Sequence, residues 1–295
     1  MAILTVDKLS KKYGNIQALD QVSFSVPKGA VFGILGPNGS GKTTLLGIVM
    51  DVLKATGGTY TLFDETPSDA QRRRIGTLLE TPNFYQYLSA VQNLKISASI
   101  KQRGEDDIEN ALTTVGLITR KDSIFSTYSL GMKQRLAIAA ALLGNPEVLV
   151  FDEPTNGLDP VGIAEIRELI KKLSQQGKTI IMASHMLDEV EKVCTHVAIL
   201  KYGKLITDGK VDEILVNDDI VEVAAVNLEQ LKNMLTEMPR NNGVYLKEKV
   251  VHVYFPAGTS NLEEVNKFCF ERGVVLSHLQ GIKKSLETKF LELTN

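Results

Sequence analysis

Residues 36–44 read GPNGSGKTT, directly after the apolar run VFGIL and before the helical pattern TTLLGIVM. Glycines let a backbone curl so that its N–H groups point at a phosphate, and the N-terminus of a following helix adds a partial positive charge. Lys42 would place a positive charge beside the β- and γ-phosphates, and Thr43 would offer a hydroxyl to Mg²⁺. A glycine-rich turn without function is the alternative, but the strand-to-helix setting predicts a P-loop. Its predicted nucleotide-binding residues are Gly36, Pro37, Asn38, Gly39, Ser40, Gly41, Lys42, Thr43 and Thr44.

Short β-branched runs recur on both sides of this loop, separated by helical patterns. Several are apolar on both faces, as strands buried in a largely parallel sheet should be. The runs are VSFSV, VFGILG, RIGTLLE, EVLVFDE, TIIMASH and HVAILKYGKLITDG. They predict a P-loop-type α/β core of three layers.

Two regions depart from this alternation of strands and helices. Residues from about 85 to 145 hold helical patterns with no clear strand, and we interpret them as a helical insertion in a first domain of residues 1–218. From 219 to 295 the order restarts as strand, helix, strand, strand, helix, strand, helix, with the turns PRNNG and PAGTSN between elements. We expect a small α+β accessory domain there. Residues 220–295 hold nine basic and nine acidic side chains, so this tail is no basic arm.

The composition of the 295-residue chain is that of an ordinary globular protein, with 43% hydrophobic and 23% charged residues. The formal net charge is -2, so the chain lacks the overall positive charge that attracts nucleic acid, and we expect no nucleic-acid partner. Cys194 and Cys269 are too few for a disulfide framework or a zinc site. No apolar run reaches membrane-helix or signal-peptide length, which predicts a cytoplasmic chain that does not cross a bilayer by itself.

Carboxylates follow the predicted strand EVLVFDE, residues 147–153. Asp152 could hold Mg²⁺ through water, and Glu153 could orient an attacking water. An acidic pair after a strand is also a common helix N-cap, but the P-loop favours the functional interpretation. His185 ends the run TIIMAS at the same edge of the sheet, where ligands of open α/β folds collect. We predict that it contacts a γ-phosphate, with a histidine capping the helix MLDEVEKV as the alternative.

Four motifs in fixed order resemble the ATP-binding subunits of ABC transporters: GPNGSGKT, YSLGMKQRL, VLVFDEPTNGLDP and ASH. The resemblance spans residues 2 to about 215. The segments IGTLLETPNFYQYLSA and SLGMKQRLAIAAALL are similar to the subunits of bacterial exporters of bacitracin-like and lantibiotic peptides. The resemblance implies a P-loop NTPase (RecA-like) core with an antiparallel β subdomain, and an ATPase that uses ATP and Mg²⁺.

The resemblance also implies roles for single residues. Tyr13, in KKYG, matches the aromatic residue that stacks on adenine, with a core tyrosine as the alternative. The D-loop, which crosses a dimer interface in the family, matches Asn156 to Asp159 and includes Asp159 as an interface residue. The remaining matches are residues 36–44 with the Walker A loop, Asp152 with the Walker B carboxylate, Glu153 with the catalytic glutamate and His185 with the switch histidine.

Glu80, in LLETP, stands where the family usually has the glutamine of the Q-loop, which contacts Mg²⁺ and relays to the membrane subunit. A carboxylate can still bind Mg²⁺, but it adds negative charge beside a triphosphate, so we expect metal affinity and coupling to differ. An exposed loop acid is the alternative. By the same resemblance, residues from about 80 to 100 would receive a coupling helix of the membrane subunit.

The segment YSLGMKQRL departs from the usual Leu-Ser-Gly-Gly-Gln of the family's signature motif. Tyr128, Leu130 and Met132 replace the leucine, the first glycine and the glutamine. Ser129 and Gly131 remain, and a serine N-cap with a nearby glycine lets backbone N–H groups approach an anion closely. A plain N-cap is the alternative for Ser129. The position about twenty residues before the acidic strand end favours the signature motif.

We therefore predict an ATPase subunit whose two copies sandwich two ATP molecules head to tail, each site pairing one chain's Walker residues with the other's Ser129. The chain would sit peripherally on the cytoplasmic face of the membrane and drive a separate permease. By analogy, the expected cargo is a peptide antibiotic, a lipid or a similar amphiphile exported from the cell.

The chief alternative is a soluble ABC-type ATPase acting on DNA or ribosomes. Such relatives carry long coiled coils, or a charged linker between two ATPase halves, and this chain has neither. A small-molecule kinase is a third reading, but it would leave YSLGMKQRL and NGLDP without a purpose.

Overall fold

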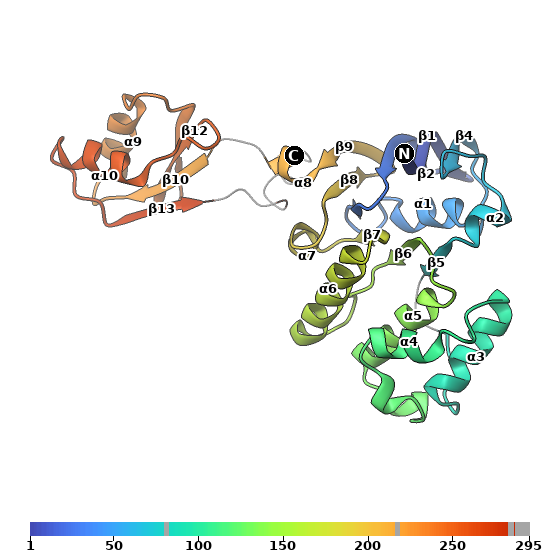
Figure 1. The fold of residues 1–295 in the computed structure, drawn as a ribbon. Coiled ribbons are helices and arrows are strands. Elements are labelled where there is room, and N and C mark those ends of the chain that lie inside the picture. The colour runs from blue at the N-terminus through green and yellow to red at the C-terminus, as the bar shows by residue number, and fades with distance from the viewer. Residues whose placement is uncertain (80–82, 216–218, 283–285, 287–295) are drawn as a thin grey trace. The chain divides into compact units, whose positions relative to one another are not determined.

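The chain divides into two compact units, Met1–Val211 and Asp212–Asn295. The division falls before the boundary that we expected after residue 218. A computed structural model describes residues 1–79, 83–215, 219–282 and 286 (Figure 1). Glu80, the predicted Q-loop residue, lies outside these described residues.

A six-stranded sheet forms the centre of the first unit, in the order β5-β6-β7-β3-β8-β9. Neighbouring strands run parallel except β9, which is antiparallel to β8. Every residue of β3, β6 and β7 is buried, which explains why these runs are apolar on both faces and confirms the predicted core. The bounds are β3 (Val31–Leu35), β5 (Ile75–Leu78), β6 (Val148–Asp152), β7 (Thr179–Ser184), β8 (His196–Lys201) and β9 (Lys204–Lys210).

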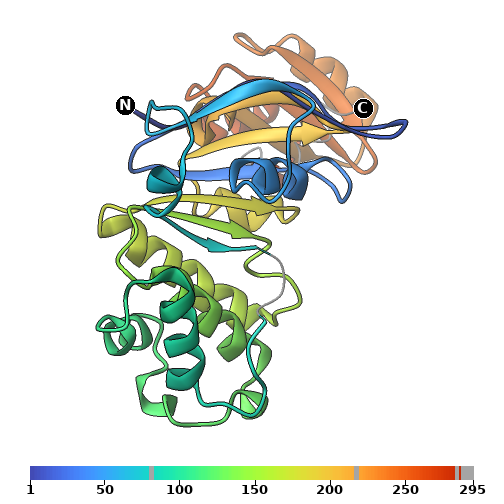
Figure 2. The ribbon, with the colours of Figure 1, turned by 90° about the vertical axis from the view of Figure 1, so that its right-hand side faces the viewer.

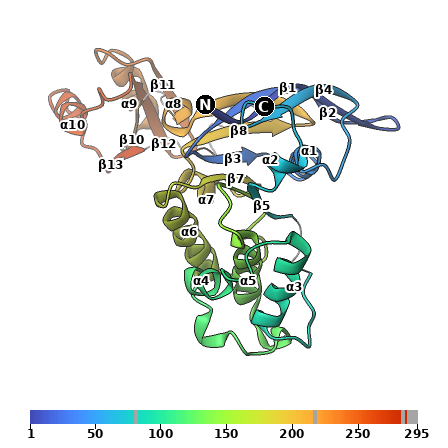
Figure 3. The same cartoon turned by 45° about the vertical axis from the view of Figure 1, so that its right-hand side comes forward.

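An antiparallel three-stranded sheet, in the order β2-β1-β4, covers one side of this core. Its strands are β1 (Ala2–Tyr13), β2 (Ile16–Pro27) and β4 (Gly57–Leu62). Helix α1 (Lys42–Val49) lies between the two sheets (Figure 3), and its Leu45, Leu46 and Ile48 join one hydrophobic cluster with side chains of both. This arrangement fixes the helix whose N-terminus follows the P-loop.

The other face of the six-stranded sheet carries α7 (Leu187–Glu191). Gly33 of β3 faces this side, where a Cβ would lie only 2.7 Å from Cγ1 of Val190. The longer α6 (Pro160–Gln175) buries an apolar stripe at a spacing typical of amphipathic helices. The short helix α2 (Asp69–Arg72) is the remaining α-helix outside the insertion in the described part of the first unit, and α8 (Val211–Leu215) begins at the last residue of this unit.

The predicted helical insertion is present (Figure 2, green helices). Ser89 starts its first helix with a capping box, in which the Ser89 and Gln92 side chains each accept a hydrogen bond from the other residue's backbone N–H. A Cβ on Gly76 of β5 would lie 2.1 Å from the Ala141 carbonyl oxygen, so the helix carrying Ala141 packs directly on the sheet. The elements are α3 (Ala90–Lys101), α4 (Ile108–Thr114), α5 (Leu130–Leu142) and the 3₁₀ turns η1 (Ile118–Arg120) and η2 (Phe125–Thr127). None of the helices in the described ranges is both long and apolar enough to span a membrane.

The second unit has the predicted α+β order, and the last expected helix falls largely outside the described residues. Its antiparallel sheet has the order β11-β12-β10-β13. Alternate residues such as Val221 and Val253 form a separate hydrophobic core with Leu231 and Val265 of the two helices. The elements are β10 (Asp219–Ala224), α9 (Leu228–Thr236), β11 (Gly243–Lys247), β12 (Val250–Phe255), α10 (Leu262–Phe270) and β13 (His278–Ile282).

Candidate functional site

The carboxyl ends of β6, β7 and β3 bring several predicted site residues to one edge of the sheet. The last residue of β3 pairs with the last residue of β7. The last residue of β6 pairs with the second-to-last residue of β7. Gly36, Glu153 and His185 are the next residues along these three strands. Residues far apart in sequence therefore meet because parallel strands end together.

Two glycines of the loop are required by the backbone itself. A Cβ on Gly36 would lie 2.2 Å from the Leu200 carbonyl oxygen. Gly41 has a φ of +103°, and a Cβ there would lie 2.5 Å from the Ala18 carbonyl oxygen. Neither position admits a larger residue without a backbone shift, so the tight curl before α1 depends on both.

The N-terminus of α1 is left open to an anion. Gly41 is its N-cap and provides no side-chain cap, and the first turn holds no acidic residue. The Ser40 hydroxyl oxygen beside it is buried without a hydrogen-bond partner, whereas Thr43 is exposed. Pro37, Asn38 and Gly39 are exposed at the tip of the loop, and Thr44 is half-buried. Uncapped N–H groups and an unused buried hydroxyl fit a phosphate-binding turn.

The catalytic candidates are connected by direct contacts. The Lys42 ammonium donates to the Gly36 and Pro37 carbonyl oxygens at 2.9 and 3.3 Å, folded back over the loop. The same Nζ lies 3.5 Å from Oε1 of Glu153. The other carboxylate oxygen, Oε2, lies 2.8 Å from Nδ1 of His185. Because a carboxylate only accepts, Nδ1 carries the hydrogen in this bond, and Glu153 joins the loop lysine to the histidine.

The backbone of Glu153 is strained. Its φ is +48°, in the left-handed region, and its N–H donates to the Ala183 carbonyl oxygen at 3.0 Å. A non-glycine residue held there costs on the order of 1 kcal/mol, and such strain clusters at functional sites. The observed strain therefore agrees with a functional role for this residue.

Two residues with oxygen donors suited to Mg²⁺ lie at the ends of elements that adjoin this edge of the sheet, one at the end of β6 and one at the start of α1. Asp152 is buried at the end of β6, and the Thr43 hydroxyl is exposed at the start of α1. The described residues contain no group of three His, Cys, Asp or Glu side chains placed to hold a metal. Two protein oxygens fit Mg²⁺, which keeps several waters and phosphate oxygens as ligands, better than a metal that needs a full protein cage.

Tyr13 ends β1 and is 43% exposed, so it is no core residue. The Lys11 ammonium lies 4.8 Å from the centre of its ring. The strand that follows it places the Ala18 carbonyl against Gly41 of the P-loop. Tyr13 is thus an accessible ring on the hairpin that adjoins the loop.

Ser129 and Gly131 lie apart from this cluster. The Ser129 hydroxyl caps α5 by accepting from the Met132 N–H at 3.3 Å, and Ser129 itself is exposed. In the described part of the chain, neither residue forms a hydrogen bond or ion pair with the P-loop, Glu153 or His185. A Cβ on Gly131 would meet nothing within 4 Å, so no neighbour among the described residues requires a glycine there.

The residue before the cap anchors this helix start. The Tyr128 side chain is buried and donates its hydroxyl to the Arg120 carbonyl oxygen at 2.7 Å, and burial raises the pKa of the phenol. Asp159 plays a similar local part at α6, where Oδ1 accepts from the Gly162 N–H at 2.7 Å. Both segments are held in defined conformations on an exposed surface.

Sequence reasoning missed two charged residues near the site. Arg167 of α6 and Glu189 of α7 form an ion pair at 3.0 Å, although each lies in an ordinary amphipathic pattern. The only sequence signal was their position shortly after the D-loop and the switch histidine, which by itself predicts no contact.

The chain is similar to ABC transporter ATP-binding proteins over nearly its full length. The family model described as ABC transporter matches residues 19–156. The bacitracin transport ATP-binding protein BcrA of Enterococcus faecalis is 32% identical over 99% of this chain and 96% of its own length. The lantibiotic transport ATP-binding protein SrtF of Streptococcus pyogenes is 37% identical over 78% of this chain and 96% of its own.

Solved structures agree. The structure of cbiO1 from Clostridium perfringens, part of the ABC transporter complex cbiONQ, has a TM-score of 0.66 and 31% identity, covering 81% of this chain and 96% of that one. A dimeric post-hydrolysis state of the ATP-binding cassette MJ0796 with ADP and Pi has a TM-score of 0.61 and 28% identity, covering 70% of this chain and 98% of that one. The chain therefore belongs to the ABC transporter family, as an ATP-binding and ATP-hydrolysing subunit.

Proposed function

We propose that this subunit drives export of a peptide antibiotic or a similar amphiphile, as a head-to-tail dimer attached to separate permease subunits at the cytoplasmic face of the membrane. The observation that carries the proposal is the Glu153 carboxylate, held between Lys42 and His185 at the mouth of the P-loop. A carboxylate in that position is suited to act as general base towards a water beside the γ-phosphate.

ATP would enter over the curled loop. The open N-terminus of α1 and Lys42 would bind its phosphates, and Lys42 would give up the loop carbonyls that it now contacts. Tyr13 would stack on the adenine. Thr43 and Asp152 would hold Mg²⁺, with Glu80 as a further proposed ligand, and the ion would neutralise charge on the phosphates.

Hydrolysis would then depend on the proton acceptor. Once Lys42 turns to the phosphates, Oε1 of Glu153 is free to accept a proton from the attacking water. His185 keeps its hydrogen bond to Oε2, which orients the carboxylate, and its ring would contact the γ-phosphate.

The far wall of each site would come from the second copy. Ser129 is exposed and Gly131 is half-buried, and no atom of the described residues lies within 4 Å of a Cβ on Gly131, which supports a close approach from outside the chain. The backbone N–H groups of a helix start that the N-cap side chain does not engage can stabilise a phosphate without charged side chains. Asp159, fixed at the start of α6, would contribute to the same interface.

The catalytic proposal is tested with Glu153→Gln. The variant should bind ATP, hydrolyse it at least roughly 10²-fold more slowly, as expected for loss of a general base, and accumulate as an ATP-bound dimer. Steady-state hydrolysis and light scattering measure the two effects. Turnover at the wild-type rate would remove Glu153 from its proposed role.

The cargo proposal rests on the names of the relatives, which transport bacitracin and lantibiotics. Cells that lack the chain should become more sensitive to one such peptide, and the wild-type gene should restore resistance whereas Glu153→Gln should not. Equal sensitivity with and without the chain, across both peptide classes, would contradict this choice of cargo.

A further inference from the structure

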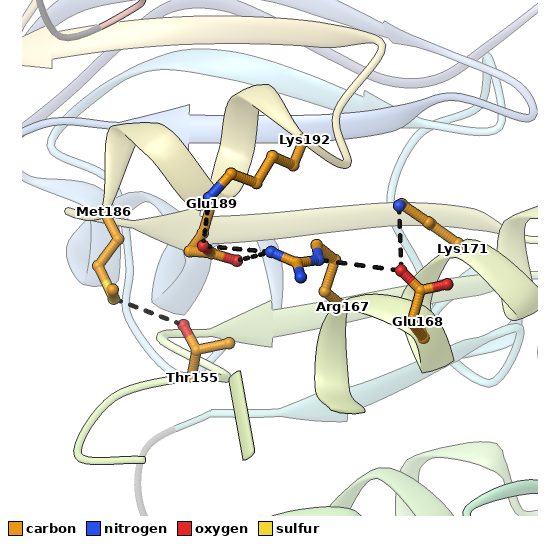
Figure 4. A network of polar contacts seen from close by, with 7 residues as sticks. All are labelled: Thr155, Arg167, Glu168, Lys171, Met186, Glu189 and Lys192. Carbon is orange, nitrogen blue, oxygen red and sulfur yellow. Dashed lines mark hydrogen bonds and ion pairs between the residues drawn. The ribbon is translucent and has the colours of Figure 1, made fainter. Parts of the chain in front are cut away.

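Arg167 of α6 and Glu189 of α7 connect the two segments that carry the catalytic candidates. The Arg167 Nη1 lies 3.0 Å from Oε2 of Glu189 and 3.3 Å from Oε1 (Figure 4). Lys192 adds a second cation, with its Nζ 2.9 Å from Oε1 of the same carboxylate. Glu189 is 13% exposed and Arg167 23%, so water screens this pair less than an exposed surface pair.

The ion pair joins elements that begin beside the site. Helix α6 starts directly after the D-loop, which follows Glu153. Helix α7 starts two residues after His185. A second bridge runs between the same segments, because the buried Thr155 hydroxyl lies 3.9 Å from Sδ of Met186 (Figure 4). The pair therefore closes a loop of contacts that includes the bond between Glu153 and His185.

A local hydrogen bond holds the start of helix α7, in which the Met186 N–H donates to the Ser184 hydroxyl at 3.0 Å. The helix has five residues, and its N-cap, Met186, makes no side-chain capping bond. Val190 is its one buried residue, packed against Gly33 of β3. A helix this short is not stable by itself, so its contacts decide where it lies. Val190 packs α7 against the sheet, and the ion pair between Arg167 and Glu189 connects α7 to α6.

We infer that Arg167 and Glu189 are positioning residues, whose ion pair holds the segment of His185 against the Glu153 carboxylate. Arg167 acts on hydrolysis through the placement of His185 and touches no reacting atom. The inference rests on the proposed role of His185.

Removal of the pair should lower kcat and leave nucleotide affinity nearly unchanged. A misplacement of about 1 Å can cost up to 10²-fold in rate, and we expect Arg167→Met to lower kcat on the order of tenfold with the KM for ATP within about twofold. Glu189→Gln should do the same, and Arg167→Lys should recover part of the loss because it retains the charge. Glu168→Gln is the matched control, because it removes the exposed partner of Arg167, 3.9 Å away, and keeps Glu189.

A double-mutant cycle with His185→Ala on the full chain separates the inference from a general structural effect. If Arg167 acts through His185, then Arg167→Met should lower kcat in the wild-type background and add nothing in the His185→Ala background. Thermal unfolding of each variant corrects for the folded fraction. An equal loss in both backgrounds, no loss in either, or a loss that follows the folded fraction would overturn the inference. If His185→Ala alone leaves kcat unchanged, the role of His185 in the proposed function fails instead, and the inference fails with it.

Discussion

At the scale of single residues, the contacts between side chains define the candidate site. Lys42 could be assigned to phosphates from its motif, but its contacts with Glu153 and the loop carbonyls depend on three strand ends meeting. The left-handed backbone of Glu153 likewise has no signature in the run VFDE. Motif spacing therefore predicted the identity of these residues and their common edge, whereas their mutual contacts come from the tertiary register.

Tyr13→Ala should weaken ATP binding. The ring is exposed on the hairpin beside the P-loop, and stacking of an aromatic side chain contributes on the order of 1 kcal/mol, about a fivefold change in Kd. Equilibrium titration with ATP under conditions that prevent hydrolysis gives the constant. Tyr13→Phe is the control, since it retains the ring and should retain the affinity. An alanine variant with unchanged Kd would refute stacking.

At the scale of elements, α5 shows how a structural and a functional interpretation can both hold. Ser129 is a helix N-cap, as the alternative interpretation supposed. Tyr128, the residue before it, anchors the start of the helix through its side chain. The same cap leaves the start of the helix exposed, with open space at Gly131. Capping does not exclude a role towards a neighbouring molecule, because the exposed Ser129 hydroxyl accepts the capping bond and can still donate its own hydrogen to a second partner.

Lys101 at the end of α3 makes stability depend on pH. Its ammonium donates to the Ala140 carbonyl oxygen of α5, and burial, with a contribution from Arg103, lowers the pKa of Lys101 to about 8. The unfolded chain keeps a value of about 10.4, so between these values the unfolded state binds more protons and stability rises with pH. The rise should be roughly 2 kcal/mol up to about pH 10, after allowance for partial exposure.

Denaturant unfolding of the wild-type protein and Lys101→Met at a series of pH values isolates this contribution. The wild-type protein should gain stability relative to the variant as the pH rises through about 8. Lys95→Met, at an exposed position on the same helix, should follow the wild-type curve. Parallel curves for wild type and Lys101→Met would show that Lys101 is not the source.

The elements that the sequence predicted are those with a strong local pattern. Strands β3, β6 and β7 are buried throughout and consist mainly of apolar residues, and α5 contains an uninterrupted apolar run, so each could be predicted from its own residues. Strands β1 and β4 could not, because their runs mix polar residues and glycine, and they are held by pairing with each other across about fifty residues. The pair between Arg167 and Glu189 also lay beyond prediction, because two surface helices must first be packed before their charges meet.

At the scale of the whole molecule, the proposed function divides each site between two groups of residues that no hydrogen bond or ion pair of the described residues connects within one chain. The P-loop, Glu153 and His185 would form one half of a site, and Ser129 with Gly131 would form the other. Two copies related by a two-fold axis, with the P-loop of each facing Ser129 of the other, would complete two sites at once. This two-fold symmetry is the one expected of an isologous dimer. ATP would then favour the closed dimer because it contacts both halves only in that state.

Mixing two inactive variants tests this central claim most directly. Lys42→Ala removes the phosphate lysine and retains Ser129, whereas Ser129→Arg obstructs the far wall and retains the P-loop. Each variant alone should hydrolyse ATP negligibly. In a mixed dimer, the intact P-loop of one chain faces the intact Ser129 of the other, so ATP hydrolysis should appear on mixing. Mixed dimers seen by light scattering without recovered hydrolysis, or full activity of Ser129→Arg alone, would contradict the account.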